Sequence, residues 1–326
     1  MSATAPVSKM TSTAEVPAAV SQATSAEPRV PLPVRGWHAV TFAVRALGDI
    51  WRTFRTARPR DRLGLTAAVL RIRSKHFLWK LSHRWTFRCE RVFGWTFDCF
   101  EYYDMFTTFE IVFLLREYRF TPQTPRPRIV DCGSNIGLSL LFFKREYPES
   151  TILAFEPDPD TFAVLRRNVE RNTLSGIELH NRALAGTPGV RDFYADSTRP
   201  GSTGMSLSRK SGLDRCTTVQ CVKLSDYIKQ EVDFLKLDIE GMELDVVQDL
   251  VESGKIQHVN QMVVEYHPAL FPHRDGYSWL RKMLQGSGFE VQLRSGSLIS
   301  LGSSIPPPLT LFAERRASSG SARSVK

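Results

Sequence analysis

Short runs of β-branched and aromatic residues alternate with longer amphipathic stretches over most of the second half of the chain. Strands are expected at 128–131, 151–155, 177–181, 234–238, 259–265, 289–293 and 310–313. Helices are expected between them at 136–147, 159–172, 241–252 and 277–285. Because strands separated by helices pair in parallel and are covered on both faces, the pattern predicts an α/β fold with a doubly wound, mainly parallel sheet.

Two segments interrupt this alternation. An insertion at 186–231 separates the third and fourth strands and contains two further strand-like pieces, 190–195 and 217–224. Ahead of the first strand, residues 94–120 combine a short aromatic strand pattern with helical periodicity at 106–115. Binding specificity usually comes from such irregular segments, so we expect it to come from these two and from the loop after His267.

A separate helical pattern covers residues 34–58 and ends at Pro59. Its apolar residues are spaced by three or four positions: Trp37, Val40, Val44, Leu47, Trp51 and Phe54. Arg45, Asp49 and Arg52 interrupt any apolar run well before the roughly 20 residues that span a bilayer. We favour a helix that packs this stripe on its own domain, and the alternative is weak contact with an anionic membrane surface.

The positive charge of the chain is concentrated in the same region. The formal net charge is +9, and residues 34–93 hold 14 lysines and arginines against 3 acids. Residues 94–326 balance at 27 basic against 29 acidic side chains. Because nucleic-acid binding needs a basic surface around the site, the nearly neutral main body makes nucleic acid an unlikely partner.

The chain ends and the cysteines add limits on the compartment. Residues 1–33 are rich in Ala, Ser, Thr and Pro and are expected to form a disordered tail, as are residues 316–326. The first tail lacks the continuous apolar stretch that a secretory signal peptide contains. The five cysteines are scattered without C-x-x-C spacing, so neither a disulfide framework nor a zinc site is indicated. We therefore expect a reducing, cytoplasmic location, with peripheral membrane association as the alternative.

The first predicted strand ends in a glycine-containing turn. The stretch "RIVDCGSNIGLSLLFF" has the form D-x-G-x-x-x-G, with Asp131, Gly133 and Gly137, and it lacks the G-x-G-x-x-G spacing of a dinucleotide site. In a doubly wound sheet this turn forms one wall of the ligand pocket, which includes Asn135. An acid that accepts from an ammonium and a helix N-terminus that attracts a carboxylate together suit an amino-acid tail.

A second acid follows the next strand. Glu156, in "AFEPDPDTF", stands where a carboxylate accepts hydrogen bonds from ribose hydroxyls. Asp158 and Pro159 are predicted as the N-cap and first residue of the following helix. The end of the third strand, through Ala183, is placed to line an adenine pocket. Ribose, an amino-acid tail and no phosphate together describe S-adenosylmethionine.

These motifs resemble those of the FkbM-type S-adenosylmethionine-dependent methyltransferases. The resemblance rests on "RIVDCGSNIG", "AFEPDPDTF", "FLKLDIEGME" and "VVEYHP" in combination, and Ser134 stands where alanine is usual. It implies a class I methyltransferase fold over 94–315, a seven-stranded sheet whose last strand is antiparallel, and residues 34–93 as an N-terminal helical extension. It also implies O-methylation of a hydroxyl on a small metabolite or glycan.

Four titratable residues follow the fourth and fifth strands of this sheet and are the catalytic candidates: Asp238, Glu240, Glu265 and His267. Asp238 is expected to face the methionine end of the cofactor or the acceptor hydroxyl. Glu240 and Glu265 would hold the acceptor or jointly a Mg²⁺ ion, although no metal ligand set is assigned. His267 is a candidate general base, or it only caps a turn.

Two other functions fit parts of the pattern. A nicotinamide-dependent oxidoreductase would use a similar sheet, but the glycine spacing disfavours it. A non-catalytic membrane-surface or RNA-binding module would use the basic helix and keep only the fold, and the acids at positions 131, 156 and 238 argue against that loss of activity.

Overall fold

The computed structural model describes residues 32–82, 87–100, 102–209, 212–271, 275–294 and 308–316. The tails expected at 1–33 and 316–326 lie almost entirely outside the described residues.

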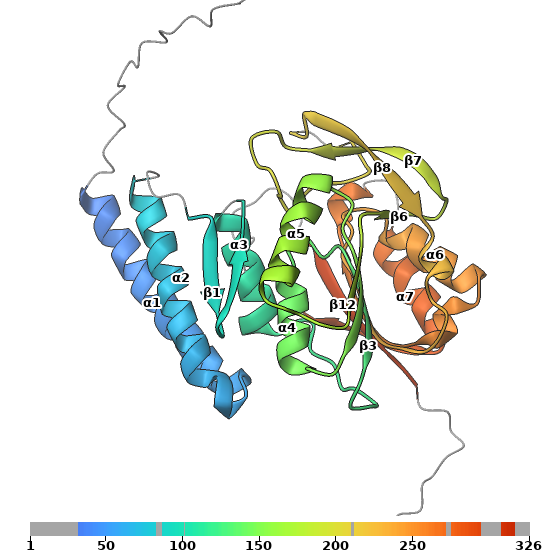
Figure 1. Ribbon diagram of the computed structural model, residues 1–326, viewed down its shortest axis with the longest axis horizontal. Coiled ribbons are helices and arrows are strands. Elements are labelled where there is room, and N and C mark those ends of the chain that lie inside the picture. The colour runs from blue at the N-terminus through green and yellow to red at the C-terminus, as the bar shows by residue number, and fades with distance from the viewer. Residues whose placement is uncertain are drawn as a thin grey trace, which may run out of the picture.

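The body of the molecule is a seven-stranded sheet in the order β11-β12-β10-β9-β3-β4-β5 (Figure 1). Its strands are β3 (Arg128–Cys132), β4 (Thr151–Phe155), β5 (Ile177–His180), β9 (Val232–Leu237), β10 (Val259–Tyr266), β11 (Phe289–Arg294) and β12 (Leu309–Arg315). β5, β4, β3, β9 and β10 pair in parallel, and β12 is antiparallel to both β10 and β11. The predicted mainly parallel sheet with an antiparallel last strand is confirmed.

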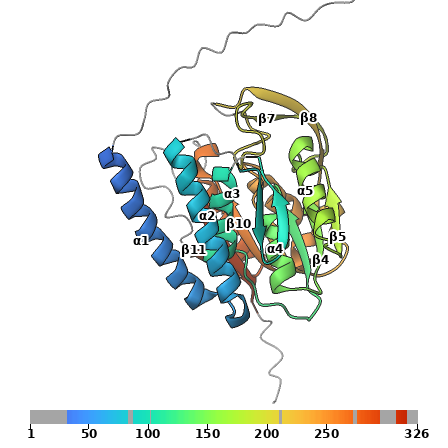
Figure 2. The ribbon, with the colours of Figure 1, turned by 60° about the vertical axis from the view of Figure 1, so that its left-hand side comes forward.

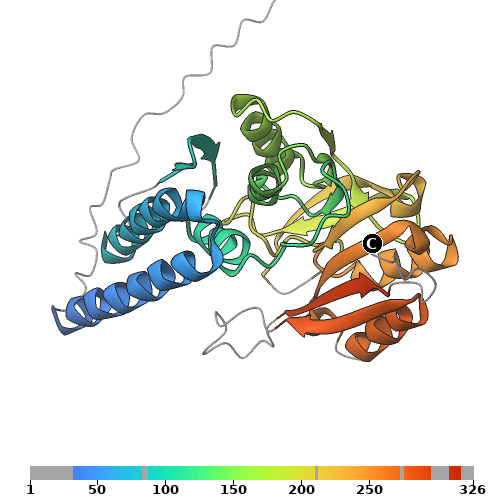
Figure 3. The ribbon, with the colours of Figure 1, turned by 90° about the horizontal axis from the view of Figure 1, so that it is seen from below.

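Helices cover both faces of this sheet (Figures 1 and 3). They are α4 (Leu138–Glu146), α5 (Pro159–Arg171), α6 (Glu243–Glu252) and α7 (Gly276–Gly286). Neighbouring strand residues point to opposite faces, so Ile129 joins the core under α4 and α5 while Val130 joins the core under α6 and α7. Asp158 caps α5 by accepting a hydrogen bond from the Thr161 amide at 2.9 Å, which confirms the predicted N-cap.

The insertion contributes two strands to a small second sheet, which also includes the preceding strand β6, in the order β6-β8-β7. The strands are β6 (Ala183–Leu184), β7 (Gly189–Ala195) and β8 (Arg215–Val222). The two longer strands match the predicted pieces, whereas the two-residue β6 is too short to leave a periodic signal. Phe193, Met205 and Cys221 form a separate small core within this sheet.

The N-terminal region forms two long helices and a hairpin. Its elements are α1 (Leu32–Thr56), a 3₁₀ turn (Pro59–Asp61), α2 (Arg62–Ser82), β1 (Cys89–Val92), β2 (Trp95–Asp98), α3 (Tyr102–Phe109) and a π-helical turn η2 (Glu110–Leu115). α2 packs its buried residues Leu65, Val69 and Ile72 into the core that α3 and α4 share. α1 is the outermost layer on this side of the molecule (Figures 2 and 3). The predicted helix and its end before Pro59 are confirmed.

The face by which α1 packs differs from our prediction. Its buried residues, among those whose side chains are described, are small or polar: Ala46, Asp49 and Thr53. Asp49 accepts a hydrogen bond from Arg73 of α2 at 2.7 Å, and the Thr53 hydroxyl donates back to the Asp49 carbonyl at 2.8 Å. The large apolar side chains are exposed instead: Val44, Leu47, Trp51 and Phe54. For these four residues the expectation that the stripe packs on its own domain was therefore wrong, because a buried ion pair and small side chains hold α1 to α2. The side chains of Trp37 and Val40, the other two residues of the predicted stripe, lie outside the described residues. Among the described residues, no helix has the length and apolar content needed to cross a bilayer.

Candidate functional site

Two adjoining cavities open where the parallel strands of the large sheet end. The first is lined by Gly133, Asn135, Phe155, Glu156, Pro157, Arg182, Ala183, Leu184, Phe193, Ser202, Thr203, Met205, Leu207, Asp238, Ile239 and Glu240. The second is lined by Thr107, Thr108, Ile111, Val112, Tyr118, Gly133, Ser134, Asn135, Ile136, Leu138, Ser139, Thr203, Lys236, Asp238, Glu240, Glu265, His267 and Pro308. They share Gly133, Asn135, Thr203, Asp238 and Glu240, so these residues form the wall between them.

Gly133 allows the ends of β3 and β9 to approach closely. Its φ of +84° lies in the left-handed region, and a Cβ there would lie 1.9 Å from the carbonyl oxygen of Asp238. No other residue fits without separating the two strand ends. Gly137 meets a different demand, because a Cβ there would lie 2.8 Å from Cδ1 of Leu165 on α5. Gly137 lines neither of these two cavities, and its lack of a side chain lets α4 pack closely against α5. Its contact with a cofactor stays a prediction.

Glu156 is held at the rim of the first cavity by backbone amides. Its Oε2 accepts from the amide of Asn135 at 2.9 Å, and its Oε1 accepts from the amide of Asp158 at 3.0 Å. Burial raises the pKa of the Glu156 carboxyl to about 8. In its charged form, which hydrogen bonds donated by a ligand would favour, the carboxylate has about four acceptor sites, so two remain for a ligand in the cavity.

The apolar part of the first cavity comes from strand ends and the insertion. Phe155, Ala183 and Leu184 line it from the large sheet and β6, and Phe193 and Met205 line it from the insertion. Ala183 was expected to line an adenine pocket, and a wall of this kind suits a flat heterocycle.

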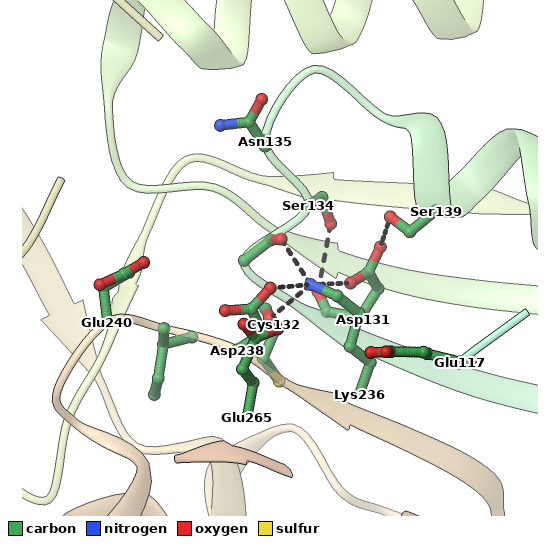
Figure 4. A network of polar contacts seen from close by, with 12 residues as sticks. Glu117, Asp131, Cys132, Ser134, Asn135, Ser139, Lys236, Asp238, Glu240 and Glu265 are labelled. Carbon is green, nitrogen blue, oxygen red and sulfur yellow. Dashed lines mark hydrogen bonds and ion pairs between the residues drawn. The ribbon is translucent and has the colours of Figure 1, made fainter. Parts of the chain in front are cut away.

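Asp131 lies behind the cavities in a buried network that Figure 4 shows. Its Oδ2 accepts from the Ser139 hydroxyl at 2.5 Å, and its Oδ1 lies 3.3 Å from the Lys236 ammonium. Lys236 also lies 3.3 Å from Oδ2 of Asp238 and donates to the Gly133 carbonyl at 2.7 Å. The structure shows Asp131 fully buried and lining neither of the two cavities. The expected direct grip on an amino-acid tail is revised, because Asp131 instead pairs with Lys236.

The predicted catalytic residues meet in the second cavity. His267 Nε2 lies 3.4 Å from Oε1 of Glu240 and 3.9 Å from Oε1 of Glu265. Its Nδ1 lies 3.5 Å from Glu243, whose carboxylate also accepts from the Gly241 amide at 3.0 Å. Glu243 is the first residue of α6, and its carboxylate ties the preceding loop and His267 together.

The charges of this cluster follow from its burial. Burial opposes a charge on His267, but the carboxylates of Glu243 and Glu240 outweigh it and raise the pKa of His267 to about 10. Burial and the nearby Asp238 carboxylate raise the pKa of Glu265 well above its usual range. In this arrangement His267 is protonated at neutral pH, which argues against the expected role of His267 as the proton acceptor.

Three of these side chains are also close enough to hold a cation. One ligand atom each from Asp238, Glu240 and His267 lies within 4.8 Å of the other two. The sequence had suggested Glu240 with Glu265 instead.

The sequence missed the residues that close the second cavity from the N-terminal side. Thr107, Thr108, Ile111 and Tyr118 come from α3, η2 and the turn that follows. Their segment, 94–120, had been identified as a source of specificity, but its apolar periodicity does not show which residues face a ligand. Glu117, which Figure 4 shows near Asp131 and Lys236, was also missed, and burial raises the pKa of its carboxyl to about 7.

The strand order, with β12 antiparallel between β10 and β11, and the site at the ends of β3, β4, β9 and β10 define a class I methyltransferase fold. Residues 131–291 match the family described as the Methyltransferase FkbM domain. The chain is 30% identical over 201 residues to Methyltransferase 1 of Beauveria bassiana. The alignment covers 55% of this chain and 79% of that protein. The chain belongs to the FkbM methyltransferase family.

A second relative supports this assignment. The chain is 31% identical over 199 residues to the 31-O-demethyl-FK506 methyltransferase FkbM of Streptomyces tacrolimicus, covering 51% of this chain and 74% of that protein. The crystal structure of Methyltransferase FkbM from Methylobacillus flagellatus matches with a TM-score of 0.41 and 18% identity, covering 85% of this chain and 60% of that one.

Proposed function

We propose that the chain transfers a methyl group from S-adenosylmethionine to a hydroxyl oxygen of a small metabolite or glycan. The observation that carries this proposal is the wall that the two cavities share, formed in part by Asp238 and Glu240. A donor in the first cavity and an acceptor in the second would meet at this wall. Methyl transfer is an in-line displacement, and alignment of the two reactants supplies much of its rate enhancement.

The first cavity suits S-adenosylmethionine by its donors, acceptors and shape. Glu156 would accept hydrogen bonds from the ribose hydroxyls, and the apolar wall that includes Phe155 and Ala183 would hold the adenine. Asp238 replaces Asp131 as the proposed partner of the amino group, because Asp238 lines the cavity. When bound, S-adenosylmethionine supplies an electrophilic methyl group on its sulfonium.

Glu240 is the proposed proton acceptor for the hydroxyl group. It lines both cavities, and its φ of +53° is a left-handed conformation that costs a non-glycine residue free energy. The protonated His267 next to it would hold the Glu240 carboxylate in place. Glu265 is proposed to contact the acceptor as a neutral carboxyl group, because its pKa is raised.

The acceptor class is supported by the names of relatives. One relative is a 31-O-demethyl-FK506 methyltransferase, and two more distant ones are the hexuronic acid methyltransferase AglP of Haloferax volcanii, at 27% identity, and the 2-O-methyltransferase NoeI of Sinorhizobium fredii, at 25% identity. These names favour an oxygen acceptor.

A Mg²⁺ ion remains a separate proposal for the same site. It rests on the proximity of Asp238, Glu240 and His267. Oxygen ligands suit Mg²⁺, and a histidine would have to lose its proton to bind a cation. Methyl transfer that persists after treatment with a chelator would remove Mg²⁺ from the mechanism.

Calorimetry with S-adenosylmethionine tests the cofactor assignment. Glu156→Ala removes the proposed ribose acceptor and leaves the Asn135 and Asp158 amides without this partner, so we expect a loss of about 1–3 kcal/mol, or roughly 5- to 150-fold in affinity. Glu170→Gln, a change at an exposed acid on α5, is the control and should bind as the wild type does.

Equal affinity of the wild type and Glu156→Ala would refute the ribose assignment. Binding of NADH in place of S-adenosylmethionine would favour the oxidoreductase alternative. Activity is then measured as transfer of a labelled methyl group to a panel of sugars and hydroxylated metabolites.

A further inference from the structure

One side of α1 exposes a row of large apolar side chains. Val44, Leu47, Trp51 and Phe54 are 65%, 68%, 62% and 45% exposed. Their spacing of three or four residues puts them on one face of the helix. Single exposed hydrophobic residues are normal on a protein surface, but a continuous row of four marks an interaction surface. We call these four residues the α1 stripe.

Arginines border the α1 stripe, and exposed acids do not. At 100° per residue, Arg45, Arg52 and Arg55 fall along one edge of the stripe. The guanidinium of Arg55 lies 4.5 Å from the centre of the Trp51 ring. Within residues 42–56 the one acid is Asp49, which is buried and paired with Arg73 of α2. The exposed surface of this helix segment therefore combines apolar and positively charged side chains.

The α1 stripe lies apart from the proposed active site. The residues that line the two cavities belong to the large sheet, the insertion, and the α3 and η2 region, and none belongs to α1. α1 is the outer layer of its side of the molecule (Figure 3). A partner that covers the stripe would therefore leave the cavities accessible.

We propose that the α1 stripe docks on the surface of an anionic lipid bilayer, with α1 lying in the plane of the interface. An apolar row with an arginine border and an interfacial tryptophan is the surface that such helices present to lipid headgroups and acyl chains. The charge complementarity favours anionic lipid, because Arg45, Arg52 and Arg55 lie beside the stripe and the one acid within residues 42–56, Asp49, is buried and paired with Arg73. The helix lies on the membrane and does not cross it.

Flotation with lipid vesicles tests this proposal on the full-length protein. Phosphatidylcholine vesicles are compared with vesicles that also contain phosphatidylserine. We expect co-flotation with the acidic vesicles and its loss as salt is raised, because salt screens the arginine contacts. Leu47→Ser combined with Trp51→Ser should lower the partition coefficient by about tenfold or more, since both side chains would leave the acyl region.

Val190→Ser is the matched control, because Val190 is a 69% exposed apolar residue on β7, far from α1 in sequence and structure. It should float as the wild type does, and thermal melts of all variants should agree. Wild type that stays in the soluble fraction with acidic vesicles overturns the proposal. If the wild type is a dimer that does not float with vesicles, and the stripe variant is a monomer, the stripe would instead be assigned to a second copy of the chain.

Discussion

Lys236→Met tests whether the buried network behind the two cavities holds the site together. Lys236 is 2% exposed and lies 3.3 Å from both Asp131 and Asp238. The substitution leaves the fully buried Asp131 carboxylate with the Ser139 hydroxyl but without its cation. Breaking a buried ion pair in this way costs about 3–5 kcal/mol. For a domain of this size, that loss lowers the melting temperature by roughly 6–20 °C.

The free energy of unfolding is measured by guanidinium denaturation followed by tryptophan fluorescence. Arg126→Met is the control, because Arg126 and Glu149 are 81% and 66% exposed and 3.9 Å apart, so the midpoint should not change. Combining Lys236→Met with Asp131→Leu removes both buried charges and should recover much of the loss. A loss below about 1 kcal/mol in Lys236→Met, or strictly additive losses in the double variant, would refute the reasoning.

Three further changes test other parts of the site. Gly133→Ala places a Cβ 1.9 Å from the Asp238 carbonyl oxygen at a φ of +84°, so it should lower the free energy of unfolding by about 2–5 kcal/mol and abolish cofactor binding. Gly254→Ala is the control, because Gly254 has a φ of +72° and open space around it, and it should lower the free energy of unfolding by only about 1–2 kcal/mol in the same denaturation assay. His267 has a folded-state pKa of about 10 against an ordinary value of 6.5, so its stabilising charge is fully present below pH 6.5 and is lost as the pH rises through about 10. The unfolding free energy of the wild type should therefore fall relative to His267→Gln over this interval, and parallel pH profiles would contradict the assignment. Ile111→Trp fills part of the second cavity only, so steady-state kinetics should show a KM for the acceptor raised by about tenfold with an unchanged affinity for S-adenosylmethionine. A change in cofactor affinity alone would show that the roles of the two cavities are reversed.

The sequence predicted the elements whose signals are local. Strand positions follow from short β-branched runs, and the α5 N-cap follows from an aspartate directly before a proline. The glycine at position 133 and the acids at 156 and 238 could be placed at the cavities because parallel strands end at the same edge of the sheet.

The rest depended on contacts between distant segments. Asp131 has the expected position in the chain, but only the pairing of β3 with β9 brings Lys236 against it. The exposed α1 stripe was mispredicted because the helical period shows which residues share a face, and not which face meets α2. In the same way, Thr107 and Tyr118 enter the second cavity through the packing of α3 and η2 on the sheet.

The most direct test of the proposed function is a crystal structure of the chain with S-adenosylhomocysteine. We predict that its ribose hydroxyls lie within hydrogen-bonding distance of Glu156, with its sulfur directed toward the wall formed by Asp238 and Glu240. A complex with the ligand bound elsewhere, and with Glu156 contacting only the Asn135 and Asp158 amides, would contradict the assignment of both cavities.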